Sequence, residues 1–341
     1  MGEVAGWERA NWFASPGQEA AYRYDWGKQN WFDNSAKECR AVRDAVALFD
    51  QTSFAKFLVQ GPDVTRALNW ISVADVDVPV GKMVYTQWLN EQGGIEADLT
   101  ITRTGAQSYL VVTAAATQTR DFSWLQRMIP AGAQCIATDL TSSLAVFGIM
   151  GPNSRALLEK VSGADLSNEG FPFATSREIE VGYARVRASR ITFVGELGWE
   201  LYVPVEFALH VYELLMKEGD AFGLRLACYH AMNSCRTEKG YRHWGHDLTI
   251  EDNPLEAGLG FCVGWEKEGG FIGLEALRKA KAAGPLTRRM VQFKLDDPGK
   301  LSITRSRSGA MGRSLAPFRR ACSGIGWAHR LEWVMSAIPK A

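Results

Sequence analysis

One phrase that occurs twice constrains the fold of this chain more than any other feature. Each copy is a strand, a Gly-Pro turn and a helix: 54–60, 61–63 and 63–72 in the first, and 144–149, 150–153 and 154–161 in the second. The copies lie about 90 residues apart, which suggests a duplicated subdomain. The repeat therefore predicts two related α+β units within one chain.

Two hairpins and three further helices are predicted around this repeat. The strands are short and alternate between apolar and polar residues: 83–89, 98–102 and 109–113, then 178–186, 189–194 and 199–203. Helices are expected at 35–47, where Ser35 is the predicted N-cap, at 205–218, and from 226 past Arg236. Antiparallel strands with helices on one side indicate the α+β class. No Gly-x-Gly-x-x-Gly phrase follows a strand, so a dinucleotide-binding fold is not indicated.

Length and composition narrow the class of protein. A chain of 341 residues predicts two or three packed modules, and 46% hydrophobic with 22% charged residues is ordinary for a globular enzyme. A formal net charge of zero excludes a global field directed at nucleic acid or an anionic membrane. No run of 18 apolar residues predicts a membrane helix. Six cysteines without a Cys-x-x-Cys pair indicate reduced thiols, so we expect a cytoplasmic protein, or a mitochondrial matrix protein in a eukaryote.

The segment 85–98 is the first of three candidate site regions. Gly93 and Gly94 form the predicted turn that brings Tyr85 and Asp98, on opposite arms of the hairpin, towards each other. A carboxylate beside an aromatic hydroxyl suits a polar ligand. Taken alone, an Asp at the start of a strand is more often a cap or a solvated residue than part of a site.

The segment 193–202 is the second candidate region. Alternation along its strand places Trp199 and Leu201 on one face, and Glu200 and Tyr202 on the other. Two aromatic rings beside a carboxylate could hold a flat heterocycle whose ring N–H groups the acid accepts. The alternative is a simple hairpin with a solvated glutamate.

The third region, 236–260, is a non-periodic stretch rich in hydrogen-bond donors, Trp and Tyr, which suits a pocket wall. His243 and His246 invite a metal interpretation, but only Asp247 accompanies them, so we predict no metal site. The charges do not form the polybasic stripe that nucleic-acid binding requires, so no nucleic-acid partner is predicted.

Several phrases, in the same order over residues 6–297, carry a family resemblance. They are Ala41-Val42-Arg43 to Leu48-Phe49-Asp50, Gly93-Gly94-Ile95-Glu96-Ala97-Asp98-Leu99, Gly195-Glu196-Leu197-Gly198-Trp199-Glu200 and Pro254-Leu255-Glu256-Ala257-Gly258-Leu259-Gly260. Together they resemble the glycine-cleavage T-protein (aminomethyltransferase) family. The phrases at 6–9, 11–13 and 241–247 are most similar to one branch, the folate-binding half of dimethylglycine and sarcosine dehydrogenases.

The resemblance implies a fold and a set of site residues. The fold is a T-protein-like cloverleaf of α+β subdomains, a folate-binding domain over 1–285, followed over 286–341 by a C-terminal β-barrel that is incomplete here. The implied ligand is tetrahydrofolate, with Asp98 as the catalytic acid near folate N10. The implied cofactor-binding residues are Tyr85, Val111, Phe193, Glu200, Arg236 and Trp244, with Glu200 anchoring the pterin. Two positions depart from the family pattern: Ala97 replaces an Asp, and Phe193 stands where Tyr is common.

The activity implied by the resemblance is folate-dependent one-carbon transfer that forms 5,10-methylenetetrahydrofolate. The one-carbon unit is expected to come from a small methylamine-derived donor, as a methylene iminium or formaldehyde equivalent. No flavin domain of the dehydrogenase branch is present, so we expect no FAD site in this chain. A flavoprotein oxidoreductase is the expected partner.

The C-terminal segment from Gly299 differs from the rest of the chain. It contains eight Lys or Arg residues against one acid, Glu332, and 302–322 has no sustained helix or strand period. A basic nucleic-acid tail is one interpretation, and a segment that packs poorly is the favoured one. We hypothesise a frame shift or a degenerate end of the reading frame after codon 299. Resequencing of the gene would refute this hypothesis if it showed an intact frame.

Three functions therefore remain open from the sequence. The first is a folate-dependent one-carbon transferase, and the second is a non-catalytic folate-binding module. The family's iron–sulfur and tRNA-modification relatives carry a Lys-Gly-Cys-Tyr-x-Gly-Gln-Glu phrase, and Lys239-Gly240-Tyr241-Arg242 lacks its Cys and Gln-Glu, which disfavours the second. The third is an inactive, truncated fragment.

Overall fold

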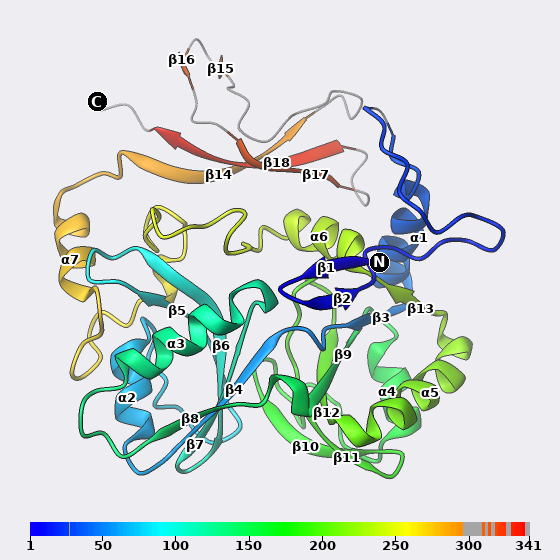
Figure 1. Ribbon diagram of the computed structural model, residues 1–341, viewed down its shortest axis with the longest axis horizontal. Coiled ribbons are helices and arrows are strands. Elements are labelled where there is room, and N and C mark those ends of the chain that lie inside the picture. The colour runs from blue at the N-terminus through cyan, green and yellow to red at the C-terminus, as the bar shows by residue number, and fades with distance from the viewer. Residues whose placement is uncertain (27, 296–308, 311–312, 315–317, 325–328, 338–341) are drawn as a thin grey trace. The chain divides into compact units, whose positions relative to one another are not determined.

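A computed structural model describes residues 1–26, 28–295, 309–310, 313–314, 318–324 and 329–337, with side chains up to residue 292 (Figure 1). The chain divides into two compact units. The first unit contains Met1–Ala55 and Leu140–Tyr241, and the second contains Lys56–Asp139 and most of the chain from Arg242 onward.

The first unit is built on a six-stranded sheet. In spatial order its strands are β10 (Ser176–Val181), β11 (Ala184–Ser189), β12 (Gly198–Pro204), β9 (Leu144–Met150), β3 (Val46–Asp50) and β13 (Leu224–Ala227). Every neighbouring pair is antiparallel except β13 and β3, which run parallel. The helices of this unit are α1 (Phe32–Asp44), α4 (Ser154–Val161), α5 (Ala208–Gly219) and α6 (Tyr229–Glu238), and a small hairpin, β1 (Gly2–Val4) and β2 (Trp7–Arg9), begins the chain.

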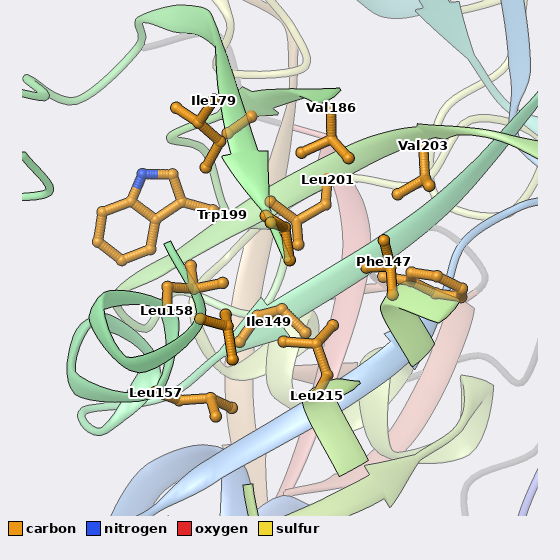
Figure 2. Close-up of a cluster of buried hydrophobic side chains, with 14 of the residues drawn as sticks. Phe147, Ile149, Leu157, Leu158, Ile179, Val186, Trp199, Leu201, Val203 and Leu215 are labelled. Carbon is orange, nitrogen blue, oxygen red and sulfur yellow. The ribbon is translucent and has the colours of Figure 1, made fainter. Parts of the chain in front are cut away.

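The main core of the first unit lies between this sheet and helices α4 and α5 (Figure 2). Alternate residues of β9 and β12 point into it, among them Ile149, Trp199 and Leu201, all fully buried. The ring of Trp199 meets Phe171 edge to face, with 6.1 Å between centroids. Burial of an indole in such a core contributes several kcal/mol to folding.

We expect Trp199→Ala to lower the free energy of unfolding by about 3–5 kcal/mol, because it removes a large buried ring and leaves a cavity. Urea unfolding of the variant and the wild type would measure the loss. Trp26→Ala is the matched control, since Trp26 is 82% exposed and surface changes usually stay within about 0.5 kcal/mol. Equal losses from the two variants would contradict the placement of Trp199 in the core.

The second unit contains a five-stranded sheet. Its strands, in spatial order, are β5 (Met83–Leu89), β6 (Ile95–Gly105), β7 (Ser108–Thr113), β4 (Ala55–Gln60) and β8 (Ile136–Asp139). Helices α2 (Val64–Ile71) and α3 (Gln118–Met128) cover one face, where Tyr109 shares a 3.0 Å hydrogen bond with Thr65. On the other face, Leu89 and Ile95 pack against residues of the long connection 242–273, which leads to α7 (Leu274–Ala282).

The predicted repeat is confirmed as β4–α2 in the second unit and β9–α4 in the first. The Gly-Pro turns of the two copies share a backbone requirement, because Gly61 and Gly151 adopt φ values of +142° and +137°. A Cβ at Gly61 would meet the Gln134 carbonyl oxygen at 2.2 Å, and one at Gly151 would meet that of Ala45 at 2.5 Å. Both turns therefore need glycine for conformation and for space.

Three boundary predictions were wrong. The helix expected at 35–47 is α1, which begins at Phe32 and ends at Asp44, and Ser35 is buried inside it instead of capping it. Val46–Phe49 then form part of β3, since a continuous apolar run suits a central strand buried on both faces. The strand expected at 178–186 is divided by a turn at Gly182, and the strand of 189–194 ends at Ser189.

The C-terminal strands form two small sheets. One contains β14 (Arg288–Leu295), β18 (His329–Ala337) and β17 (Phe318–Gly324), and the other contains β15 (Gly309–Ala310) and β16 (Arg313–Ser314). Across the residues described, these strands do not close into a barrel, so the predicted β-barrel is not confirmed. Much of the segment 302–322 lies outside the described residues, and the domain boundary at 285 stays a prediction. No helix in the described part of the chain is long and apolar enough to cross a membrane.

Candidate functional site

The hairpin of β5 and β6 places three polar side chains on one face of the second unit's sheet. Two of them, Tyr85 and Asp98, were predicted, and the third is Gln87. Gln87 pairs directly with Asp98 in the ladder, and Tyr85 lies two residues before Gln87, so all three share a face. The Gln87 Nε2 donates a 2.9 Å hydrogen bond to Asp98 Oδ1. The Tyr85 hydroxyl lies near the Asp98 carboxyl and favours its ionised form. The structure thus brings Tyr85 and Asp98 together, as predicted.

Asp98 is held in an environment that favours its neutral form. Burial raises the pKa of its carboxyl from the ordinary 3.8 to about 6, although the hydrogen bond from Gln87, the nearby Tyr85 hydroxyl and the charge of Arg242 act in the opposite direction. A carboxyl with a pKa of about 6 can both accept and return a proton near neutral pH. This property fits a general acid or base better than a solvated cap.

Two residues of the connection 242–273 complete the surroundings of Asp98. Phe261, in the short 3-10 helix Gly260–Cys262, is 78% exposed, and its ring stacks on Tyr85 with 6.4 Å between centroids and 29° between planes. Cys262 is buried near Asp98 and Gln87, and burial raises the pKa of its thiol to about 12. A protonated thiol is a poor nucleophile, so Cys262 contributes packing while Phe261 presents an aromatic surface.

Trp244 and Val111 occupy different faces of this sheet. The indole Nε1 of Trp244 donates a 2.8 Å hydrogen bond to the Ile95 carbonyl at the start of β6, and the Arg120 guanidinium lies 4.2 Å from the ring centroid. Val111 is fully buried and pairs with Ile101, three residues from Asp98 along β6. Its side chain therefore lies on the opposite face from Asp98. The predicted role of Val111 stays a prediction, and its side chain does not reach the Asp98 face.

Glu200 is the second predicted carboxylate, and it lies in the first unit. It is in β12, with Gly148 and Ser189 as its neighbours across the ladders. The Tyr202 hydroxyl donates a 2.6 Å hydrogen bond to Glu200 Oε2, and Gln51 Nε2 donates to Oε1 at 3.4 Å. Burial raises the pKa of Glu200, and these two hydrogen bonds oppose that increase.

The heterocycle cradle expected around Glu200 needs one correction. The alternation predicted for β12 is confirmed, but the ring of Trp199 is fully buried in the opposite core and cannot stack on a ligand of Glu200. Phe193 stacks on Tyr241, with 6.1 Å between ring centroids. Arg236 is fully buried in α6 and donates a 3.0 Å hydrogen bond to the Tyr241 carbonyl. Phe193 and Arg236 therefore share Tyr241 as a neighbour.

The predicted site residues form two groups, one in each unit. The second unit contains Asp98, Tyr85, Val111 and Trp244, and the first contains Glu200, Phe193 and Arg236. Gln87, Gln51, Arg242 and Phe261 were not predicted from the sequence. Gln87 could not have been found from the turn at 90–94 alone, because a bulge between the Leu89–Ile95 and Trp88–Ala97 pairs shifts the register by one residue. Gln51 carried no local signal, since 149 residues separate it from Glu200.

No group of metal-binding side chains exists within the residues that the structure describes. The rings of His243 and His246 lie 4.4 Å apart, and the Asp247 carboxylate accepts a 2.9 Å hydrogen bond from the His243 backbone N–H. This arrangement uses the Asp as a local turn-forming acceptor.

The raised pKa of Asp98 predicts a pH-dependent stability. Between pH 3.8 and about 6 the folded chain holds a proton that the unfolded chain has released, so this group stabilises the fold at low pH and loses that contribution as the pH rises through 6. Asp98→Asn removes the titration. We expect the variant to gain about 1–3 kcal/mol relative to wild type between pH 4 and pH 7, measured by urea unfolding. A difference that is constant with pH, as expected for the exposed control Glu91→Gln, would contradict the assignment.

Comparison with protein families gives one match that covers most of the chain. The model described as the GCVT N-terminal domain matches residues 1–267. This range includes every residue of the two predicted groups.

Several curated proteins are similar to this chain. The 4-methylaminobutanoate oxidase (formaldehyde-forming) of Paenarthrobacter nicotinovorans is 42% identical, over 92% of this chain and 39% of the oxidase. The mitochondrial sarcosine dehydrogenase of Homo sapiens is 38% identical, over 86% of this chain and 36% of the dehydrogenase. An aminomethyltransferase of Halothermothrix orenii is 34% identical, over 81% of this chain and 76% of that protein. The chain thus spans well under half of the first two relatives.

A solved structure establishes the fold. The crystal structure of glycine cleavage system aminomethyltransferase T from Bartonella henselae matches with a TM-score of 0.80 and 22% identity, over 93% of this chain and 86% of that one. The resemblance to the T-protein fold is therefore confirmed, as a mixed fold of helices and sheets.

Proposed function

Because this chain belongs to the GCVT N-terminal domain family, the aminomethyltransferase type of folate-dependent one-carbon transfer, we propose that it binds tetrahydrofolate and forms 5,10-methylenetetrahydrofolate on it. The observation that carries the proposal is the Asp98 carboxyl, which Gln87 and Tyr85 orient and whose pKa burial raises to about 6. We assign Asp98 the catalytic role.

Tetrahydrofolate supplies two nitrogens, N5 and N10, which together bind the carbon of formaldehyde with loss of water, or that of a methylene iminium with release of the amine. Asp98 accepts the proton released at N10 and returns it to the departing water or amine. Tyr85 and Gln87 keep the carboxyl in place, so little reorganisation is needed at the moment of transfer. Phe261 offers an exposed ring beside Tyr85 that suits contact with an aromatic part of the ligand.

Glu200 is proposed to anchor the pterin. Its carboxylate keeps acceptor capacity after the hydrogen bonds from Tyr202 and Gln51, and pterin N–H groups are suitable donors. Phe193, Arg236, Trp244 and Val111 are retained as proposed cofactor-binding residues. Together these residues offer hydrogen-bond acceptors for ring N–H groups and aromatic surfaces for stacking, and both suit a folate.

The names of two relatives support a proposal for the donor and the partner. One relative is a formaldehyde-forming oxidase of a methylamino acid, and another is a sarcosine dehydrogenase. We propose a small methylamine-derived donor for this chain, oxidised by a flavoprotein partner, and we place no FAD site within residues 1–341.

The proposal is tested by adding formaldehyde and tetrahydrofolate to the purified chain and following 5,10-methylenetetrahydrofolate above the uncatalysed background. Acceleration that saturates with tetrahydrofolate supports the transferase. Binding without acceleration would instead support a non-catalytic folate-binding module, and neither binding nor acceleration would indicate an inactive fragment. Glu91→Gln, an exposed substitution in the Asp98 hairpin, is the control.

A further inference from the structure

The two carboxylates share one arrangement of partners, although they lie in different units. Asp98 receives a hydrogen bond from the Gln87 amide and lies near the Tyr85 hydroxyl, and Glu200 receives hydrogen bonds from the Gln51 amide and the Tyr202 hydroxyl. In both cases the amide nitrogen is the donor, so the amide carbonyl points away from the carboxylate.

Both glutamines are buried, and each has an unsatisfied carbonyl. Gln87 is 0% exposed and Gln51 is 3% exposed. Among the residues with described side chains, neither Gln87 Oε1 nor Gln51 Oε1 has a hydrogen-bond partner, and both atoms are inaccessible to solvent. A buried acceptor without a donor destabilises the fold. An apolar side chain of the same shape would avoid this cost, so packing does not explain glutamine at either position.

The backbone beside Gln51 is adapted to that side chain. Gly148, which faces Glu200 across the ladder, would place a Cβ 2.5 Å from Gln51 Oε1 if it were any other residue. The absence of a side chain at Gly148 therefore makes the space in which the amide reaches Glu200. The Gln87 amide reaches Asp98 because the two residues lie directly opposite each other in the β5–β6 ladder.

We propose that Gln87 and Gln51 are positioning residues, which hold the Asp98 and Glu200 carboxylates in a fixed orientation towards the ligand despite the stability that their unsatisfied carbonyls cost. The proposal rests on the proposed function, because the ligand is the folate assigned there. It concerns residues to which the family resemblance gave no role.

A neutral amide has a specific advantage over a charged donor at these positions. An Arg or Lys in contact would bind the carboxylate as an ion pair and lower its pKa well below the ordinary value. The amide fixes the geometry but leaves burial as the dominant effect, so Asp98 keeps a pKa of about 6. The other titratable groups that act on Asp98 are Tyr85, Cys262 and Arg242, and the one that acts on Glu200 is Tyr202.

The test uses Gln87→Met and Gln51→Met, which keep length and apolar volume but remove the amide. We expect each variant to be at least as stable as wild type at pH 5, since the unsatisfied carbonyl is gone. We expect the pKa of the facing carboxyl to rise by about one unit, because one hydrogen bond to the ionised form is lost. Thermal unfolding at pH 5 and pH 8 and carboxyl ¹³C NMR titration measure the two effects, with Asp98→Asn and Glu200→Gln assigning the signals.

Gln92→Met, an exposed change in the turn of the Asp98 hairpin, should alter neither quantity. The inference is overturned if either Gln87→Met or Gln51→Met unfolds earlier than wild type at pH 5 or fails to fold, while in the other variant the facing carboxyl keeps its wild-type pKa. That result would show that the amides are structural. Neither readout needs folate. A wild type that binds no folate therefore refutes the proposed function separately, while the NMR and unfolding results still decide the role of the amides.

Discussion

We expect Asp98→Asn to lower the rate of one-carbon transfer to tetrahydrofolate by about 10²–10⁴-fold, the range typical for loss of a general acid or base. The amide has the shape of the carboxyl but cannot accept and return a proton. The dissociation constant for tetrahydrofolate should change much less, because Glu200, and not Asp98, is the proposed anchor. Turnover with formaldehyde and calorimetric titration of tetrahydrofolate would measure the two quantities on the same preparation.

The matched control for this substitution is Glu91→Gln, which removes a carboxylate from an exposed position of the same hairpin and should leave turnover unchanged. A normal rate in Asp98→Asn would refute the catalytic role. An equal loss of binding and turnover would instead move Asp98 to the anchoring role.

Glu200→Gln should produce the second large effect, a decrease in tetrahydrofolate affinity of about 10- to 100-fold. This corresponds to the roughly 1.5–3 kcal/mol typical of a hydrogen bond to a charged group. Stability at neutral pH should not fall, because burial already disfavours the ionised Glu200 carboxyl and raises its pKa. Calorimetry on the variant, together with urea unfolding at pH 7, separates loss of the anchor from loss of the fold.

Glu180→Gln is the control for this second substitution, since Glu180 is an exposed carboxylate in β10 of the same sheet. Affinity unchanged in Glu200→Gln would exclude Glu200 as the pterin anchor. The Asp98 prediction would be unaffected by that result, because the two carboxylates lie in separate units.

Local patterns in the sequence were sufficient for the elements that carry the two carboxylates. The strands expected at 98–102 and 199–203 lie within β6 and β12, which carry Asp98 and Glu200. The faces of β12 also follow from alternation, because the side-chain period of a strand is two. Hence residue patterns alone are enough to assign Asp98 and Glu200 to the correct strands.

Features that depend on distant segments were not predicted. The strand Val46–Asp50 exists because it lies between β9 and β13, which are about 100 and 180 residues away, and its apolar run resembles a helix face equally well. For the same reason Gln51 could not be linked to Glu200. Trp199 shows a different limit: alternation identified its face correctly, but only the packing of α4 and α5 showed that this face is the core.

Titration of tetrahydrofolate against the purified 341-residue chain, followed by calorimetry and by quenching of tryptophan fluorescence, tests the central claim most directly. We predict saturable, one-to-one binding that is weakened by Glu200→Gln and largely retained by Asp98→Asn. The absence of saturable binding at millimolar tetrahydrofolate, in a chain shown to be folded by a cooperative unfolding transition, would contradict the account.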